Sequence, residues 1–307
     1  MIRLPDPRSA SRWCAQQRAR CGDDALGYVP TMGALHRGHL SLVERAAREN
    51  RAVCASIFVN PLQFDDADDL RRYPRNEARD HDLLERAGCD MVYGGTLAEF
   101  FPESENAAAN ITVNPPDAII VSDTNAFMRD LEGAHRRGHL QGVRAIVERL
   151  FATVGACNAY FGAKDFQQTL VVKDLARAFD GIRVVVCPTV REPSGLALSS
   201  RNQRLHADQL AVAAQLYQAL LAARAEWRAG RRERDAIEAA MREILRDARI
   251  TLEYVAVRDP ETWDDIWENT INDTKTNATT RAIALVAARI GAVRLIDNLR
   301  LDDADQE

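Results

Sequence analysis

The first two thirds of the chain alternate short apolar runs with segments of helical periodicity, and this alternation limits the folds that are possible. The apolar runs are continuous and rich in β-branched residues, as buried parallel strands are. They occupy residues 26–29, 52–59, 89–94, 159–162 and 182–188. The segments with helical spacing lie between them, at 39–50, 76–88, 141–154 and 165–179. Repeated strand–helix–strand units predict an α/β fold with a doubly wound parallel sheet.

The pattern changes after about residue 190. Residues 207–228 and 231–247 are helical patterns rich in Ala and Arg. Three strand-like runs follow, at 252–259, 282–290 and 293–299. We therefore expect a first domain in residues 1–190 and a smaller α+β domain with an antiparallel sheet in residues 191–307. The polar stretches 103–110 and 266–280 are predicted surface loops.

Composition and charge argue against several classes of protein. The net charge is −5, whereas nucleic-acid binding normally needs a basic face. No apolar run is long enough to span a membrane, and the N-terminal segment lacks the apolar core of a signal peptide. None of the six cysteines forms a C-x-x-C pair, and Cys54 and Cys187 lie in strand-like runs where we expect them to be buried. These features favour a reducing, cytoplasmic environment without nucleic-acid or membrane partners.

Polar, glycine-containing segments follow four of the predicted strands. They read PTMGALHRGH, NPLQF, AKDFQQ and TVREPSGLALSSRN. Ligands of open α/β sheets bind at the carboxyl ends of the strands, so we expect these segments to converge on one site. The chain contains neither a P-loop nor a strand–G-x-G-x-x-G–helix unit, which argues against the common modes of phosphate and dinucleotide binding.

His36 and His39 stand three residues apart, after a glycine-containing turn and before a helical pattern. In one interpretation, the exposed N–H groups of the turn and the helix dipole bind an anion, and the imidazoles add donors. In a second, the histidines merely cap the helix. A third, a zinc pair, lacks an evident further ligand. The residues alone leave these alternatives open.

The other three segments also admit two interpretations each. Lys164 forms either an exposed ion pair with Asp165 or a contact that neutralises phosphate charge. The serines and Arg201 of the LSSRN segment suit phosphate oxygens, but a serine there also suits a helix N-cap. Gln63 and Gln168 are either ordinary surface residues or ligands for a hydroxyl and a carboxylate of a small acid.

Taken in order, the segments resemble those of one enzyme family. PTMGALHRGH, SIFVNPLQF, RYPR, LEGAHRRGHLQGV, YFGAKDFQQ, REPSGLALSSRN and VRLIDN are similar to the motifs of pantoate–β-alanine ligases, from about residue 26 to 299. The resemblance implies a cytoplasmic homodimer with a Rossmann-like domain of the nucleotidyltransferase superfamily and a C-terminal lid domain. It also implies that ATP, with Mg²⁺, activates pantoate as pantoyl adenylate, which β-alanine then converts to pantothenate.

The resemblance also assigns roles to individual residues. It makes His36, His39, Lys164 and Arg201 catalytic. The residues expected to contact ATP are these four together with Met32, Gly162, Asp165, Leu198, Ser199 and Ser200. Those expected around pantoate and β-alanine are Pro30, Met32, Asn60, Gln63, Arg136, His139, Phe161 and Gln168. Asp80 matches an acidic position near the magnesium ion.

The sequence departs from the family pattern near the acid and amine. Arg137 replaces proline, Leu140 phenylalanine, Ala163 glutamate and Ser194 aspartate, and the stretch 103–130 is longer than usual. These departures leave open a ligase of the same mechanism that uses another hydroxy acid or amine. A different nucleotidyltransferase and a non-catalytic binding protein are further alternatives; the acidic charge argues against the RNA-binding form of the former, and the intact histidines, lysine and serine loop against the latter.

Overall fold

A computed structural model describes residues 1–22, 25–102, 125–263 and 281–302. Within it the chain forms two compact units, Met1–Val190 and Arg191–Glu307, and each is described here by itself. The predicted loops at 103–110 and 266–280, and most of the long stretch 103–130, lie outside the described residues.

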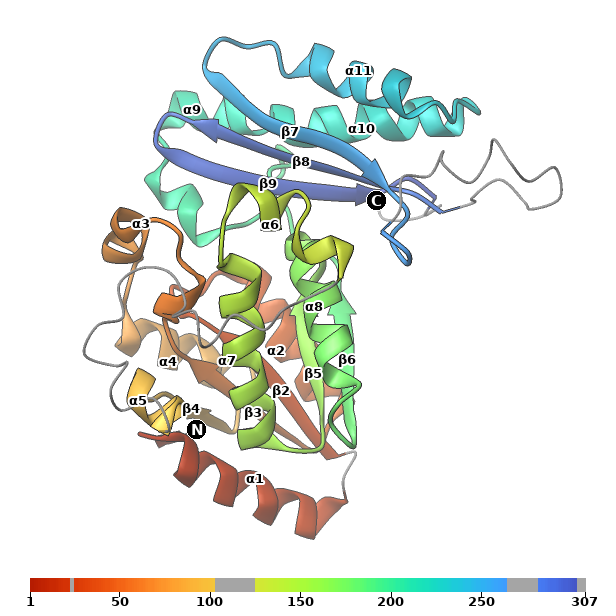
Figure 1. Cartoon of the computed structure of the whole chain (residues 1–307). Helices are drawn as coiled ribbons and strands as arrows, with labels where there is room; N and C mark the ends of the chain where they lie inside the picture. The colour runs from red at the N-terminus through yellow and green to blue at the C-terminus, as the bar shows by residue number, and fades with distance from the viewer. Residues whose placement is uncertain (23–24, 103–124, 264–280, 303–307) are drawn as a thin grey trace, which may run out of the picture. The chain divides into compact units, whose positions relative to one another are not determined.

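The first unit is built on a six-stranded sheet in the order β1-β4-β3-β2-β5-β6, in which every pair of neighbours is parallel (Figure 1). Its strands are β1 (Ile2–Leu4), β2 (Leu26–Thr31), β3 (Ala52–Ile57), β4 (Met91–Tyr93), β5 (Cys157–Gly162) and β6 (Ile182–Cys187). The predicted α/β fold class is confirmed. The five predicted strands are present, and β1, which is only three residues long, was missed.

Helices cover both faces of this sheet. They are α1 (Pro7–Cys21), α2 (Arg37–Glu49), α3 (Ala67–Arg72), α4 (Glu77–Arg86), α5 (Leu97–Phe100), α6 (Glu132–His135), α7 (His139–Val154) and α8 (Phe166–Ala176). Short 3-10 turns precede or connect them: η2 (Pro61–Gln63), η5 (Ala126–Met128) and η6 (Ala163–Asp165). The sequence did not predict α1, because its side chains are mostly polar and only Ala10 and Cys14 are buried. Its start is nevertheless well defined, since Asp6 accepts the N–H of Ser9 as the N-cap.

Alternate residues of the strands pack on opposite helical layers. Leu26 and Tyr28 of β2 belong to the cluster formed with α1, α7 and α8, whereas Val29 belongs to the cluster formed with α2 and α4. Cys54 and Cys187 are buried in these clusters, as predicted. Burial on both faces explains why the strands are continuous apolar runs rather than alternating ones.

The strand order fixes the place where a ligand site is expected. From β2 the chain proceeds through β3 and β4 toward one edge of the sheet, and β5 and β6 extend toward the other. The direction of winding therefore reverses between β2 and β5, and in open α/β sheets the crevice at this switch point binds ligands. Thr31 ends β2 and Gly162 ends β5.

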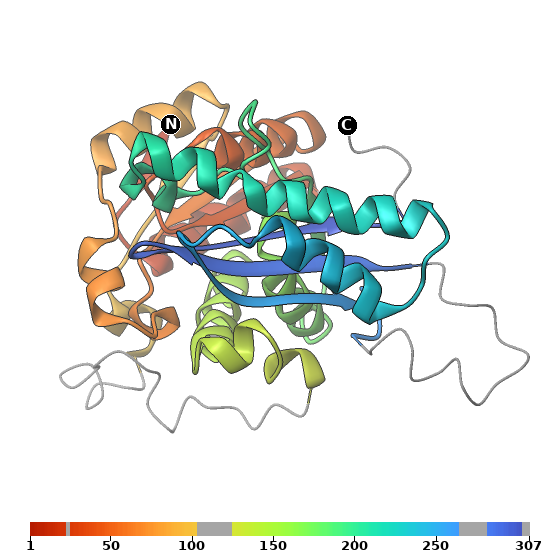
Figure 2. The ribbon, with the colours of Figure 1, turned by 90° about the horizontal axis from the view of Figure 1, so that it is seen from above.

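The second unit contains an antiparallel sheet of β7 (Ile250–Arg258), β8 (Ile283–Ile290) and β9 (Val293–Arg300). The helices α10 (Gln215–Arg228) and α11 (Arg234–Ile244) run along these strands (Figure 2) and bury a separate core with them. The helical pattern at 207–228 is divided at Ala214 into α9 (Ala207–Ala213) and α10. A 3-10 turn, η7 (Ser200–Arg204), precedes α9. The expected α+β character is thus observed.

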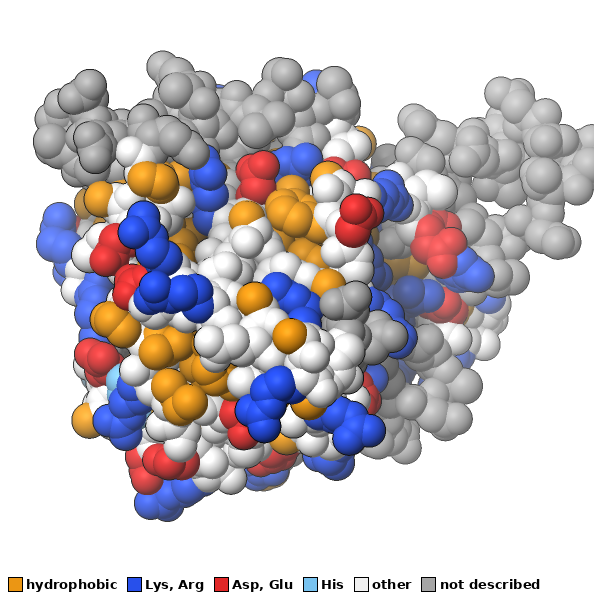
Figure 3. Space-filling view, turned by 90° about the horizontal axis from the view of Figure 1, so that it is seen from below, with side chains coloured by type: hydrophobic (Ala, Val, Ile, Leu, Met, Phe, Trp, Pro, Cys, Tyr) orange, Lys and Arg blue, Asp and Glu red, His pale blue; other side chains and the backbone are white. Residues whose placement is uncertain are grey.

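None of the helices in the described residues is both long and apolar enough to cross a bilayer. On the face seen from below in Figure 3, acidic and basic side chains are interspersed among small apolar patches.

Candidate active site

The turn between β2 and α2, which carries both predicted histidines, has an unusual backbone. Gly33 and Ala34 have positive φ angles of 78° and 51°, and this left-handed region costs an alanine about 1–2 kcal/mol. The N–H of Gly33 donates to the hydroxyl of Thr31 at 3.2 Å, and that hydroxyl donates to the carbonyl of Ser56 at 2.8 Å. The turn is therefore fastened to the ends of the two strands beside it.

The next two N–H groups of this turn bind a carboxylate of the protein itself. Asp80, in the first turn of α4, is only 1% exposed. Its Oδ2 accepts the N–H of Ala34 at 2.8 Å, and its Oδ1 accepts the N–H of Leu35 at 2.9 Å. In one of the interpretations left open by the sequence, N–H groups of this turn bind an external anion. The N–H groups of Ala34 and Leu35 instead bind an internal one.

The same geometry does not support Asp80 as a magnesium ligand. Both of its oxygens accept backbone N–H groups, and the side chain is enclosed. The residues that the structure describes also contain no group of three or more His, Cys, Asp or Glu side chains that would hold a metal ion. This finding gives no support to a zinc site at His36 and His39 either.

His36 and His39 each use one ring nitrogen to cap α2. Nδ1 of His36 accepts the N–H of Gly38 at 3.1 Å, and Nδ1 of His39 accepts the N–H of His36 at 3.4 Å. A nitrogen that accepts a hydrogen bond carries no proton, so the neutral rings hold their proton on Nε2. Both histidines therefore cap α2, but capping uses only Nδ1 and leaves each Nε2–H as a donor with no acceptor in the described parts of the chain.

The surroundings of these histidines favour the neutral rings. Burial and, to a smaller extent, the nearby Lys164 lower the pKa of His36 to about 4, and Asp165 partly opposes this shift. Burial lowers the pKa of His39 to about 3, with smaller effects from His36 and Lys164. At neutral pH the turn therefore presents two neutral donors, since protonation of Nδ1 would also remove the acceptors that cap α2.

Lys164 and Asp165 extend from the end of β5 toward the same place. The Lys164 Nζ lies 3.7 Å from Asp165 Oδ1, and both groups act on the pKa of His36. Only three of the 40 lysine and arginine residues of this chain are lysines, so a lysine at this position is not the default choice. A Cβ added to Gly162 would meet no atom within 4 Å, so the missing side chain leaves open space at the strand end.

Asn60 and Gln63, in the segment after β3, form a unit in which only one member faces outward. Asn60 is 1% exposed; its Oδ1 accepts the N–H of Leu62, and its Nδ2 donates to the carbonyl of Gly142 at 3.0 Å. Nδ2 also donates to Gln63 Oε1 at 3.2 Å, which directs the Gln63 NH₂ group toward the sulfur of Met32. Asn60 therefore orients Gln63, and Gln63 supplies the donor.

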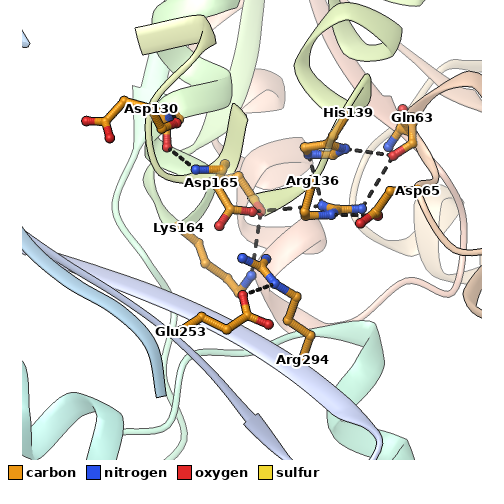
Figure 4. A network of polar contacts seen from close by, with 11 residues as sticks. Gln63, Asp65, Asp130, Arg136, His139, Lys164, Asp165, Glu253 and Arg294 are labelled. Carbon is orange, nitrogen blue, oxygen red and sulfur yellow. Dashed lines mark hydrogen bonds and ion pairs between the residues drawn. The ribbon is translucent and has the colours of Figure 1, made fainter. Parts of the chain in front are cut away.

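Arg136 and His139 form a closed cluster with the same segment (Figure 4). Arg136 donates to Asp65 Oδ1 at 3.0 Å and to His139 Nε2 at 3.0 Å, and Nδ1 of His139 lies 2.7 Å from the carbonyl of Gln63. A carbonyl only accepts, so Nδ1 of His139 carries the proton and Nε2 accepts from Arg136. Both ring nitrogens are thus used within the protein. Burial and Arg136 lower the pKa of His139 to about 3.

Two residues outside the predicted set support these segments. Asp65 binds Arg136, as described above, and directly follows NPLQF in the sequence. Gln167 is 2% exposed, donates to the carbonyls of Phe127 and Asp130, and accepts the N–H of Glu132. Its neighbour Gln168, the predicted ligand, is half-buried, and its side chain makes no hydrogen bond within the described residues. Within QQ, the sequence offers no signal that separates the two.

The residues predicted for the apolar side of the acid pocket differ in exposure. Pro30 and Met32 are partly exposed, near the end of β2 and in the turn that follows. Phe161 is 4% exposed and packs edge-on against Phe151 of α7. Of the departures from the family pattern, Leu140 is buried with Met128, whereas Arg137 is exposed. Leu140 therefore packs within the core.

The serine segment belongs to the second unit. Oγ of Ser199 accepts the N–H of Arg201 at 3.2 Å and caps η7, while Ser200 is buried and Leu198 is half-buried. Gly195 packs closely: its φ is 87°, and an added Cβ would collide with the ring of Tyr217.

A buried aspartate anchors the beginning of this segment. Arg191 donates to both oxygens of Asp297, at 2.5 and 3.0 Å, and its guanidinium stacks 4.0 Å above the ring of Tyr217. Sequence reasoning missed this pair, whose members lie 106 residues apart. The start of the segment is thus fixed to β9.

Comparisons with known proteins agree with the resemblance. The family model described as "Pantoate-beta-alanine ligase" matches residues 4–300. The chain belongs to the pantoate–β-alanine ligase family. Pantothenate synthetase of Chloroflexus aggregans is 44% identical over 284 residues, covering 92% of this chain and 95% of the relative. That of Roseiflexus sp. RS-1 is 44% identical over 279 residues, covering 90% and 92%.

Solved structures of this family share the fold. Pantothenate synthetase from Thermus thermophilus is 40% identical, covers 99% of this chain and 100% of its own, and gives a TM-score of 0.80. The pantoate–β-alanine ligase of Francisella tularensis, in complex with "Beta-gamma ATP" and β-alanine, is 28% identical, covers 99% of both chains and gives a TM-score of 0.70. The family consists of ligases that form a C–N bond, and the predicted family and enzyme class are confirmed.

Proposed function

We propose that the chain condenses pantoate with β-alanine, the two substrates for which its family is named. ATP drives this reaction. The observation that carries the proposal is the gathering, at the sheet's switch point, of two neutral histidine donors, Lys164 and the Gln63 amide. The pantoate carboxylate attacks the α-phosphorus of ATP, the bond to the β-phosphate breaks, and pantoyl adenylate and pyrophosphate form. The β-alanine amine then attacks the acyl carbon, AMP leaves and the amine loses a proton.

The phosphates bind to side chains rather than to the backbone of the turn. Nε2–H of His36 and of His39 donate to phosphate oxygens, and the Lys164 ammonium offsets the charge that develops during adenylation. Donors already held in place cost little reorganisation in the transition state. Gly162 and Asp165 lie beside the nucleotide, and Leu198, Ser199, Ser200 and Arg201 of the second unit, acting as a lid, add contacts to the β- and γ-phosphates.

The acid binds to Gln63 and Gln168, with Pro30, Met32 and Phe161 on its apolar side. Asn60 fixes the Gln63 amide so that its NH₂ group lies beside the sulfur of Met32, and the second N–H of this group suits a carboxylate or hydroxyl oxygen. Asn60, Arg136 and His139 contribute by orienting this segment, because their polar groups are engaged within the protein.

Magnesium accompanies ATP in this proposal. Mg²⁺ in nucleotide sites is held mainly by phosphates, waters and one or two carboxylates, which fits the absence of a three-ligand cluster from the described residues. When bound, the ion would neutralise phosphate charge, and Asp165, whose carboxylate lies 3.7 Å from the Lys164 ammonium, would be available to it. We also propose a cytoplasmic homodimer; six free cysteines in the chain are consistent with a reducing compartment.

The departures at Arg137, Ala163 and Ser194 favour a second candidate, a ligase of the same mechanism that uses another acid or amine. Mass-spectrometric identification of the products formed from ATP, Mg²⁺, pantoate and β-alanine tests the proposal. We expect pantothenate and AMP in equal amounts. AMP formation with pantoate but without pantothenate would point to another amine, and no AMP at all would contradict the proposed acid.

A further inference from the structure

The turn Thr31–His36 has a strained backbone, so other contacts must stabilise its conformation. Its backbone is left-handed at Gly33 and Ala34, and alanine does not choose this region spontaneously. The turn ends at His36, whose backbone N–H and ring both take part in capping α2. Any change in the turn therefore moves the two Nε2–H donors.

Asp80 is the group that holds this shape. It reaches the turn from α4, more than 40 positions along the chain, and binds the two consecutive N–H groups of Ala34 and Leu35 with its two oxygens. A turn with successive N–H groups pointing to one side is an anion-binding concavity. The position of Asp80 in the first turn of α4 also suits a negative charge, because the positive end of the helix dipole lies there.

The Asp80 carboxylate is buried in close contact with the turn. The carboxylate is 1% exposed, and a Cβ added to Gly33 would lie 3.0 Å from its Oδ2. Glycine at position 33 thus serves both the backbone conformation and the approach of the carboxylate. The two features occur together because the turn is closed around an internal anion.

We propose that Asp80 is a positioning residue for the adenylation step, acting through the turn to set the direction of the His36 and His39 donors. This inference rests on the phosphate-binding role proposed for the two histidines. In this proposal Asp80 binds the backbone of the turn instead of a magnesium ion. The substrate phosphates then find the side-chain donors, while the protein itself satisfies the N–H groups that a phosphate-binding loop would use.

Asp80→Asn is the substitution that tests this role, because it keeps the size of the side chain but turns one acceptor into a donor facing an N–H group. Asp82→Asn is the matched control: Asp82 lies on the same helix, is exposed and pairs only with Arg86 at the surface. Should Asp80→Asn alone fail to fold, the same change is made in an Ala34→Gly background, where a positive φ costs little.

Two measurements separate positioning from a purely structural role. At a temperature far below the melting transition, kcat for pantoate-dependent ATP–pyrophosphate exchange should fall about 100-fold in Asp80→Asn, because a shift of about 1 Å in a catalytic group costs that much. The pantoate KM should stay unchanged, and so should the half-saturating Mg²⁺ concentration. In parallel, the ¹⁵N shifts of the His36 ring should show loss of the single Nε2–H tautomer.

The outcomes are distinct. Wild-type kcat in folded Asp80→Asn, or an unchanged His36 tautomer, would overturn the proposal, and an increased Mg²⁺ requirement would restore the metal-ligand role. The tautomer result does not depend on the activity. If the histidines proved unnecessary for exchange, the proposed phosphate contacts would fail while the effect of Asp80 on the turn would remain measurable.

Discussion

Two histidine-containing regions of the first unit use the same side chain in opposite ways. In the turn before α2, His36 and His39 accept through Nδ1 and keep a proton on Nε2. In the cluster before and at the start of α7, His139 donates through Nδ1 to the Gln63 carbonyl and accepts through Nε2 from Arg136. In the first region the Nε2–H groups of His36 and His39 are left as donors for a ligand. In the second region both ring nitrogens of His139 bind groups of the protein.

The difference shows that proximity to a site does not by itself make a residue a ligand. All three histidines have a pKa lowered to about 3 or 4, mainly by burial. What distinguishes them is whether Nδ1 accepts or donates its backbone hydrogen bond, and whether Nε2 already has a partner in the described part of the protein. We therefore expect loss of His36 and His39 to lower the rate of adenylate formation, and loss of His139 to weaken the binding of pantoate.

The largest effect should come from replacing both histidines of the turn. In His36→Ala/His39→Ala, adenylate formation should fall at least 1000-fold, since a single positioned donor is worth roughly 10²–10³ in rate. Pyrophosphate exchange measures this step. His206→Ala, at an exposed position of the second unit, serves as the control, and near-normal exchange in the double variant would remove the distinction between the two regions.

A smaller effect is expected at His139. His139→Leu removes the link between Arg136 and the Gln63 carbonyl, so the pantoate KM should rise about tenfold, the size expected when about 1.4 kcal/mol of binding is lost. His139→Gln can donate and accept in the same directions and should recover most of the affinity. Steady-state kinetics with pantoate as the varied substrate provide the test. A large loss of kcat in both variants would place His139 among the catalytic residues instead.

Two glycines allow a comparison between open space at the candidate site and close packing within the protein. At Gly162 an added methyl group meets nothing within 4 Å, while at Gly142 it would overlap the Leu62 carbonyl. Gly162→Ala should keep the melting temperature and raise the ATP KM several-fold, whereas Gly142→Ala should destabilise the fold by roughly 1–3 kcal/mol through overpacking. Calorimetry and ATP titration distinguish the two. Unchanged ATP affinity in Gly162→Ala would show that the space is not used.

The smallest effect is on the pH dependence of stability. The three histidines have folded pKa values of about 4, 3 and 3, below the unfolded value of about 6.5. Between those values the unfolded chain binds more protons, so stability is greatest above pH 6.5 and falls as the pH decreases toward 4. Urea unfolding from pH 7 to 5 should show a shallower slope in His139→Gln, by up to one proton. An identical slope would mean that the ring is protonated equally in both states.

Much of the fold could be predicted from the sequence because its signals are local. Continuous apolar runs indicated β2 to β6, and their order implied parallel pairing and a site at the strand ends. The polar helix α1 and the three-residue strand β1 give no such signal, since few of their side chains are buried. The division of the 207–228 pattern at Ala214 depends on packing within the second unit.

The sequence predicted both residues and roles for the candidate site, but it did not predict the contacts that bear on three of those roles. The motifs indicated that Asn60, Asp80 and His139 belong near the site, and they lie in segments adjoining it. Their roles depend on partners distant in sequence: Gly142 for Asn60, Ala34 and Leu35 for Asp80, and Gln63 for His139. A sequence shows which residues carry polar atoms, but not which of those atoms the backbone has already bound.

The tautomers of the three histidines in the unliganded protein test the central claim most directly. Long-range ¹H–¹⁵N correlation spectra, with each ring assigned by a His→Gln variant, distinguish a protonated Nε2 from a protonated Nδ1. We predict neutral Nε2–H rings for His36 and His39 and a neutral Nδ1–H ring for His139 at pH 7. An Nδ1–H tautomer or a charged ring at His36 or His39 would contradict the account, because the turn would then cap α2 differently and present no pair of neutral donors.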